Sequence, residues 1–196
     1  MPFVQPVLEV MPESEQFSDI TVRPSSPRID VTKLLRSMPG GPNHLMLAGT
    51  DIGMRSLVEK CLGEKDLPAM VIDVSAADSV SEFAAMIRDE LRRLCPDVPI
   101  GLCENERYAL TGILQLADRL FTAERRLVIV FHEFHHVRRL APWTEYLMRS
   151  VMQFFNNVTF IFTGSNSKVM TDIFCNVRKP FFHFGLFVLL EPGRWS

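Results

Sequence analysis

The segment LVIVFHEFHH, residues 127–136, holds the side chains of this sequence best suited to chemistry. His132, Glu133 and His136 have the spacing H-E-x-x-H. On a helix this spacing presents two imidazoles to a zinc ion, one turn apart, and the glutamate acts as general base. The same letters also fit the end of a buried strand, where an acidic pair that serves Mg²⁺ has become His-Glu. The two interpretations predict different proteins.

The residues around the motif favour a strand end. The five residues before His132 are Leu, Val, Ile, Val and Phe, which is strand composition. Pro142 is suited to begin the next helix, so little room is left for an active-site helix. A third ligand is also missing, since Glu145 is only nine residues past His136 and no motif supports His183. A zinc hydrolase using His132 and His136 is therefore the weaker alternative.

Short apolar runs alternate with longer segments of helical periodicity from about residue 44 onward. Runs without polar alternation predict strands covered on both faces, and strands alternating with helices predict a parallel sheet. We therefore expect a three-layer α/β/α domain with a mainly parallel five-stranded sheet, whose ligands bind at the carboxyl ends of the strands. The expected strands are 44–48, 69–74, 127–131, 158–163 and 185–190. The expected helices are 53–62, one that starts at Ser79 with Glu82 completing a capping box, 106–121, 142–155 and 168–175.

The segment AGTDIGMRS, which follows the first strand, approximates the phosphate-binding pattern G-x-x-x-x-G-K-[ST]. Anchoring the pattern on Gly53 puts Met54 at the lysine and Arg55 at the hydroxyl. Anchoring it on Gly49 puts Arg55 at the lysine and Ser56 at the hydroxyl, but places Met54 at the second glycine. Neither alignment is an intact loop, and an ordinary glycine-containing turn is the alternative.

The ends of the third and fourth strands carry the other candidate residues. His132 stands where nucleotide hydrolases place the aspartate that serves Mg²⁺, and Glu133 stands where they place the base. A neutral imidazole is a poor ligand for Mg²⁺, which prefers oxygen. After the fourth strand, Thr163, Ser165 or Asn166 could sense a terminal phosphate. The alternative is a Gly-Ser-Asn turn that only starts a helix.

The order of these motifs resembles the archaeal-type ATPase branch of the AAA superfamily, over about residues 44–190. The most specific part is VTFIFTGSNSKVMTDIF, and the weakest is the loop near Gly53. The resemblance implies a P-loop NTPase-like fold, an intact phosphate loop, Asp-Glu-Phe after the third strand and T-G-S after the fourth. This sequence departs from that pattern at Met54, Arg55 and His132. Such proteins normally continue into a helical or winged-helix lid, which we expect to be missing, since the sequence ends at Ser196.

These departures predict a degraded AAA-type domain, a pseudo-ATPase more than an enzyme, that acts as a protein-binding or regulatory module. We expect no cofactor, and a protein partner or self-association. Phe181, Phe182 and Phe184, together with the Pro-rich N-terminal arm, could form an apolar patch for a partner, or the phenylalanines could simply complete the core.

The alternative is a nucleotide-binding protein with weak ATPase activity. ATP and Mg²⁺ would then be held by the degenerate loop, with Glu133 as base and Asn166 as sensor. Asp51 argues against this alternative, because a carboxylate inside the loop would repel phosphate.

Composition sets the remaining expectations. The 196 residues suit one domain, with a Pro-rich arm at 1–42 and the AAA-type domain at 43–196; seven of the 13 prolines lie in the arm. A net charge of −2 gives no support for a nucleic-acid partner. Four cysteines without a C-x-x-C pair, and no secretory leader, predict reduced thiols and a cytoplasmic protein. No apolar stretch approaches the roughly 20 residues of a membrane span.

Overall fold

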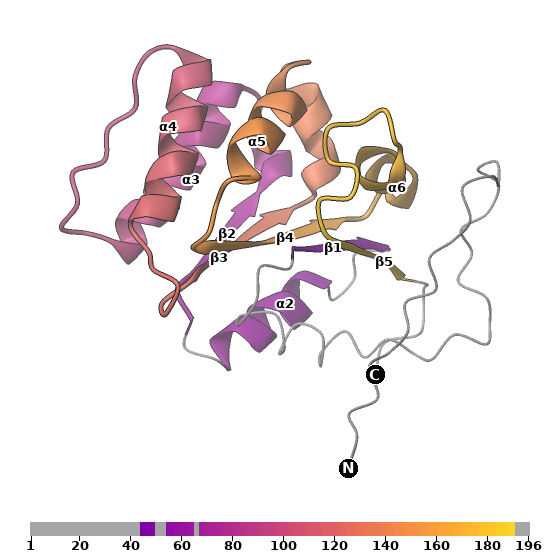
Figure 1. Cartoon of the computed structure of the whole chain (residues 1–196), viewed down its shortest axis with the longest axis horizontal. Coiled ribbons are helices and arrows are strands. Elements are labelled where there is room, and N and C mark those ends of the chain that lie inside the picture. The colour runs from indigo at the N-terminus through magenta and orange to yellow at the C-terminus, as the bar shows by residue number, and fades with distance from the viewer. Residues whose placement is uncertain (1–43, 50–53, 65–66, 191–196) are drawn as a thin grey trace.

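A five-stranded sheet lies at the centre of the computed structural model, which describes residues 44–49, 54–64 and 67–190 (Figure 1). The predicted arm at 1–42 and the loop residue Gly53 lie outside the described residues. The strands are β1 (Leu45–Gly49), β2 (Ala69–Asp73), β3 (Leu127–His132), β4 (Val158–Gly164) and β5 (Leu186–Leu190). They lie in the order β2-β3-β4-β1-β5, and every pairing is parallel.

Helices cover both faces of the sheet, which confirms the predicted three-layer α/β/α architecture. The α-helices are α2 (Met54–Gly63), α3 (Val80–Leu94), α4 (Glu106–Arg119), α5 (Thr144–Met152) and α6 (Ser167–Cys175). Two short 3₁₀ helices, η2 (Val74–Ala76) and η3 (Phe134–Arg139), follow β2 and β3. Figure 1 shows α3, α4, α5 and α6 on one face of the sheet and α2 on the other.

The side chains of β3 explain why its sequence is apolar throughout. Ile129 and Phe131 are buried on the face covered by four helices, whereas Val128 and Val130 are buried on the opposite face with Val58 of α2. Alternate residues of a strand point to opposite faces, so a strand between two layers needs apolar residues at every position.

The helix α3 begins at the capping box that the sequence predicts. At Ser79 the Oγ accepts a hydrogen bond from the Glu82 backbone N–H at 3.1 Å, as the capping box predicts. The Glu82 carboxylate accepts in turn from the backbone N–H of Asp78 at 2.8 Å.

The prediction that Pro142 begins the helix after β3 was wrong. Pro142 lies in a turn before α5, and that turn is closed by a hydrogen bond from Thr144 N–H to the Ala141 carbonyl.

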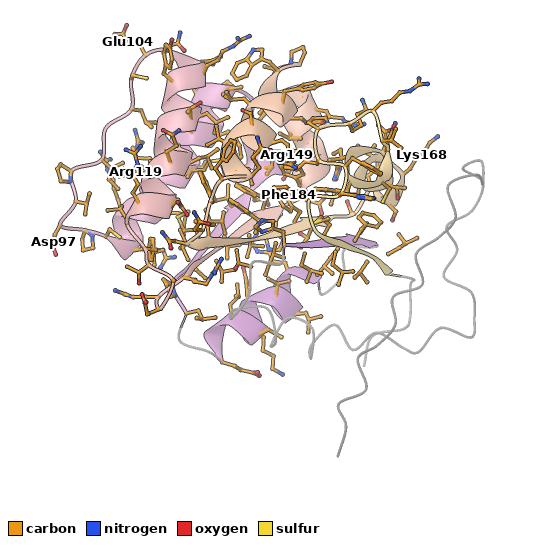
Figure 2. The ribbon with its side chains drawn as sticks, in the orientation of Figure 1. Asp97, Glu104, Arg119, Arg149, Lys168 and Phe184 are labelled. Carbon is orange, nitrogen blue, oxygen red and sulfur yellow. The ribbon has the colours of Figure 1, made fainter. Side chains whose placement is uncertain are left out.

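The phenylalanines near the C-terminal end of the described chain belong mainly to the core. Phe181 and Phe184 are buried in an aromatic cluster, and Phe182 is half-buried, so the predicted apolar patch is not formed by these three residues together. The guanidinium of Arg149 lies over the Phe184 ring, 4.9 Å from its centroid (Figure 2). The aromatic residues after α6 thus pack the last described part of the chain against the sheet.

In the part of the chain that the structure describes, no helix combines the length and apolar character needed to cross a membrane.

Candidate functional site

His132 is the last residue of β3, and its ring is buried at the carboxyl edge of the sheet. The residue is only 3% exposed, and Nδ1 lies 2.6 Å from Oγ1 of Thr163 on the neighbouring strand β4. Parallel pairing of β3 with β4 brings these two residues together although they are 31 positions apart. The segment is therefore a strand end. The one-turn helical pairing of His132 with His136 that a zinc-protease motif requires is not present.

Glu133 leaves the strand in a left-handed backbone conformation, with φ of 49°. For a residue with a Cβ this conformation costs about 1–2 kcal/mol, so surrounding contacts must hold it. Here Oε2 accepts hydrogen bonds from the Ser165 hydroxyl at 2.7 Å and from the Ser165 backbone N–H at 3.3 Å. The carboxylate is thereby fixed against the T-G-S turn that follows β4.

Two histidines follow within η3 and lie beside this carboxylate. Nδ1 of His135 is 3.2 Å from Oε2 of Glu133, and the rings of His135 and His136 have centroids 4.2 Å apart. The pKa of His135 is lowered by burial, by His136 and by Arg139, and Glu133 opposes that shift. From the sequence, His132 and His136 were the metal candidates, and His135 was considered only as a member of the histidine cluster at 132–136. The signal that could have found it is the adjacent His-His pair.

The candidates for the phosphate loop are only partly brought together among the described residues. Gly49 ends β1 in a buried position and Met54 begins α2, whereas Ser56 is exposed on the first turn of that helix. Arg55 is 54% exposed and forms an ion pair with Glu59 at 2.9 Å, one turn along the helix. The cation proposed for phosphate thus has a carboxylate partner on its own helix.

Asp73 is a residue at this edge of the sheet that the sequence did not single out. It is the last residue of β2, where it pairs with His132 of β3. Its Oδ1 accepts hydrogen bonds from the Ser75 backbone N–H at 3.0 Å and from the Ser75 hydroxyl at 2.6 Å, and its other oxygen is 3.7 Å from Arg55. The sequence feature that could have indicated Asp73 is an acidic residue at the end of the apolar run AMVID.

Asn166 is the N-cap of α6. Its Oδ1 accepts a hydrogen bond from the backbone N–H of Val169 at 3.1 Å, the bond that a capping asparagine ordinarily makes. Its position therefore agrees with the simpler alternative, a turn that starts a helix. Thr163, a second candidate sensor, lies on β4 and is buried against His132.

Arg138 anchors η3 to two helices and so helps to hold the histidines in place. Its guanidinium contacts Glu145 of α5 at 2.8 Å and Asp172 of α6 at 2.7 Å. The pKa of Asp172 is lowered chiefly by a hydrogen bond from Asn176 and, further, by Arg138.

Arg138→Met should lower the free energy of unfolding by about 1–3 kcal/mol, because two carboxylates lose charge-assisted hydrogen bonds. Lys179→Met is the matched control, since Lys179 reaches the same Asp172 only at 3.8 Å; we expect less than about 0.5 kcal/mol there. Urea unfolding of both variants measures the difference. Equal effects would contradict the assignment of Arg138 as the anchor.

Comparison with known proteins finds similarity in structure alone. No protein-family model matches the sequence, and no curated protein matches it. The Walker-type ATPase of Pyrococcus abyssi superposes with a TM-score of 0.60 at 17% identity, over 85% of this chain and 53% of that chain. The ORC2 protein of Aeropyrum pernix, solved in ADPNP–ADP complexes, gives 0.55 at 16% identity, over 82% and 46%. A chain of Drosophila ORC bound to DNA gives 0.53 at 11% identity, over 82% and 90%.

The strand order, the two covering layers and these superpositions together define a P-loop NTPase-like fold of the type found in AAA ATPases. The chain spans about half the length of the two archaeal structures. At these identities the likeness concerns the fold alone.

Proposed function

We propose that this chain is an AAA-type domain without ATP hydrolysis that acts through contacts with protein partners. The observation that carries this proposal is the buried contact between His132 and Thr163 at the carboxyl edge of the sheet. An imidazole stands there in place of a carboxylate, and Mg²⁺ prefers oxygen ligands. Phosphoryl transfer depends on positioned charge around the phosphates, so loss of the metal ligand removes a large part of catalysis.

Two further contacts support the loss of hydrolysis. Glu133 stands at the position of a catalytic base, but its carboxylate is engaged by Ser165 and lies against His135. A general base must reach the proton that it abstracts, directly or through one water. The charge of Arg55 is likewise balanced by Glu59.

Exposed aromatic side chains support the protein-binding part of the proposal. Tyr108 of α4 is 73% exposed, Phe154 just after α5 is 72% exposed, and Tyr146 of α5 is exposed as well. Aromatic residues are enriched at protein interfaces. A net charge of −2 offers little to a nucleic-acid backbone, although one structure of similar fold is an ORC chain bound to DNA.

The second candidate is a nucleotide-binding protein with weak ATPase activity. The observation in its favour is the fold shared with ORC2 of Aeropyrum pernix, which was solved with ADPNP and ADP. In that case Gly49, Arg55 and Ser56 would contact phosphate, Glu133 would act as base and Asn166 as sensor.

Steady-state ATP hydrolysis separates the two candidates when the chain is compared with its own Glu133→Gln variant. Glu133→Gln removes the one candidate base at nearly constant shape, so it is a matched blank for contaminating ATPases. We expect both proteins to release phosphate at the same background rate. A general base contributes about 100- to 10,000-fold, so release by the unmodified chain about 100-fold or more above the variant would overturn the proposal.

A further inference from the structure

The geometry points to a binding site for one divalent transition-metal ion of the zinc class, formed by Glu133, His135 and His136. One donor atom from each of these residues lies within 4.8 Å of the other two. The His135 Nδ1 and Glu133 Oε2 atoms are already 3.2 Å apart. Ligands of a tetrahedral zinc ion, with bonds of about 2.0–2.2 Å, are separated by about 3.3–3.5 Å. A small closure around the ion would therefore complete the set.

The chemistry of the donors selects the class of metal. Two imidazoles and one carboxylate form a typical ligand set for zinc and its neighbours, whereas Mg²⁺ and Ca²⁺ prefer oxygen alone. Nδ1 of His135 is buried and makes no hydrogen bond, although it faces Oε2 of Glu133 at ion-pair distance. The lone pair of a neutral ring and a carboxylate in that arrangement can share a bound cation.

Three features of the surrounding structure allow this cluster to form without the ion. The left-handed conformation of Glu133 turns the chain sharply between β3 and η3, which places its carboxylate beside the two rings. Gly164 leaves room for His135, since a Cβ there would lie 3.3 Å from Nδ1 and 2.7 Å from Met170 Sδ. Ser165 donates to Glu133 and would orient a ligating carboxylate from behind.

The site differs from the H-E-x-x-H pattern and does not depend on the absence of ATP hydrolysis. His132, the first histidine of the pattern, faces Thr163 and takes no part in the cluster. A bound ion would cross-link the end of β3 to η3. Because Glu133 would be one of its ligands, the ion would also keep this carboxylate from acting as a base.

Metal titration of the full chain tests the site. Tag-free protein is treated with a chelator, passed into metal-free buffer and titrated with Zn²⁺ by calorimetry and with Co²⁺ by visible absorption. We expect one equivalent of each metal and the intense visible bands of a low-coordinate Co²⁺ ion. His135→Ala and His136→Ala should each weaken Zn²⁺ binding by more than about 100-fold, and Ser165→Ala by about 10–100-fold, the range of a residue that only orients a ligand.

His183→Ala is the matched control, because His183 is exposed and is not part of the cluster. The His183→Ala variant should bind Zn²⁺ with the same affinity as the unmodified chain. The site is refuted if the unmodified chain binds no Zn²⁺ at micromolar concentration. It is also refuted if His135→Ala and His136→Ala bind as tightly as the unmodified chain, or if His183→Ala weakens binding as much as they do. Circular dichroism confirms folding, and where one cluster variant does not fold, the other decides.

Metal affinity and ATP hydrolysis are separate measurements. A chain that binds zinc and also hydrolyses ATP would refute only the proposed function, and one that does neither would refute only the metal site.

Discussion

Gly185→Ala should lower the free energy of unfolding by about 3 kcal/mol, because the structure leaves no room for a methyl group at this position. A Cβ at Gly185 would overlap the carbonyl oxygen of His44 and lie 2.8 Å from its carbonyl carbon. The obstacle is backbone, which cannot rotate away. The same carbonyl accepts the hydrogen bond from Leu186 N–H at 2.9 Å, so the added methyl group would force β5 from β1.

Gly112→Ala is the control for this experiment. Gly112 is exposed within α4, and a Cβ there would meet no atom within 4 Å. Alanine is the better helix former, so we expect a gain of about 0.5–1 kcal/mol. Urea unfolding at pH 7 measures both variants. A Gly185→Ala protein as stable as the unmodified chain would show that β1 and β5 do not approach as described.

Lowering the pH from 7 to 5 should destabilise the fold by about 2 kcal/mol through His44. Burial, together with Arg126 and Arg149, lowers the pKa of His44 to about 4. Its ring stacks on Phe184 at 4.4 Å, and Nδ1 accepts a hydrogen bond from the Phe160 backbone N–H at 3.2 Å. Only the neutral ring can accept that hydrogen bond, so the folded state resists protonation.

The sign of this effect follows from which state binds the proton. In the unfolded chain the His44 pKa returns to about 6.5, so below that pH the unfolded state binds more protons than the folded state. The stability is fully present above pH 6.5 and is lost as the pH falls toward 4. His44→Asn, whose Oδ1 can replace Nδ1 as acceptor, should show a shallower loss in urea unfolding at pH 7, 6 and 5. The loss should not vanish, because the lowered pKa of His135 acts in the same direction. Parallel profiles for the two proteins would contradict the assignment.

The sequence was sufficient to predict the strands and the layers, because those depend on patterns that adjacent residues carry. Unbroken apolar runs such as residues 127–131 identify strands buried on both faces, and the structure places β3 there, one residue longer. The choice of a strand over a zinc-protease helix was right for the same reason. The start of α5 was misjudged because proline suits both the first turn of a helix and the turn before it.

The contacts of the site could not be predicted, because they join residues that are distant in sequence. Nothing near His132 indicates that its ring meets Thr163 on the neighbouring strand. The left-handed conformation of Glu133 is uncommon for glutamate and is held by contacts with a turn 32 residues later. The burial of Phe181 and Phe184 could not be predicted either, because it depends on how the chain after α6 returns to the sheet.

We expect that the carboxyl edge of this sheet does not bind Mg²⁺ and ATP productively. Calorimetric titration of the full chain with ATP, with and without Mg²⁺, tests it most directly. We expect no binding that depends on Mg²⁺ at ATP concentrations up to about 1 mM, which corresponds to a binding free energy weaker than about −4 kcal/mol. Binding at micromolar ATP that requires Mg²⁺ would contradict this expectation, because His132 would then stand in a working metal site.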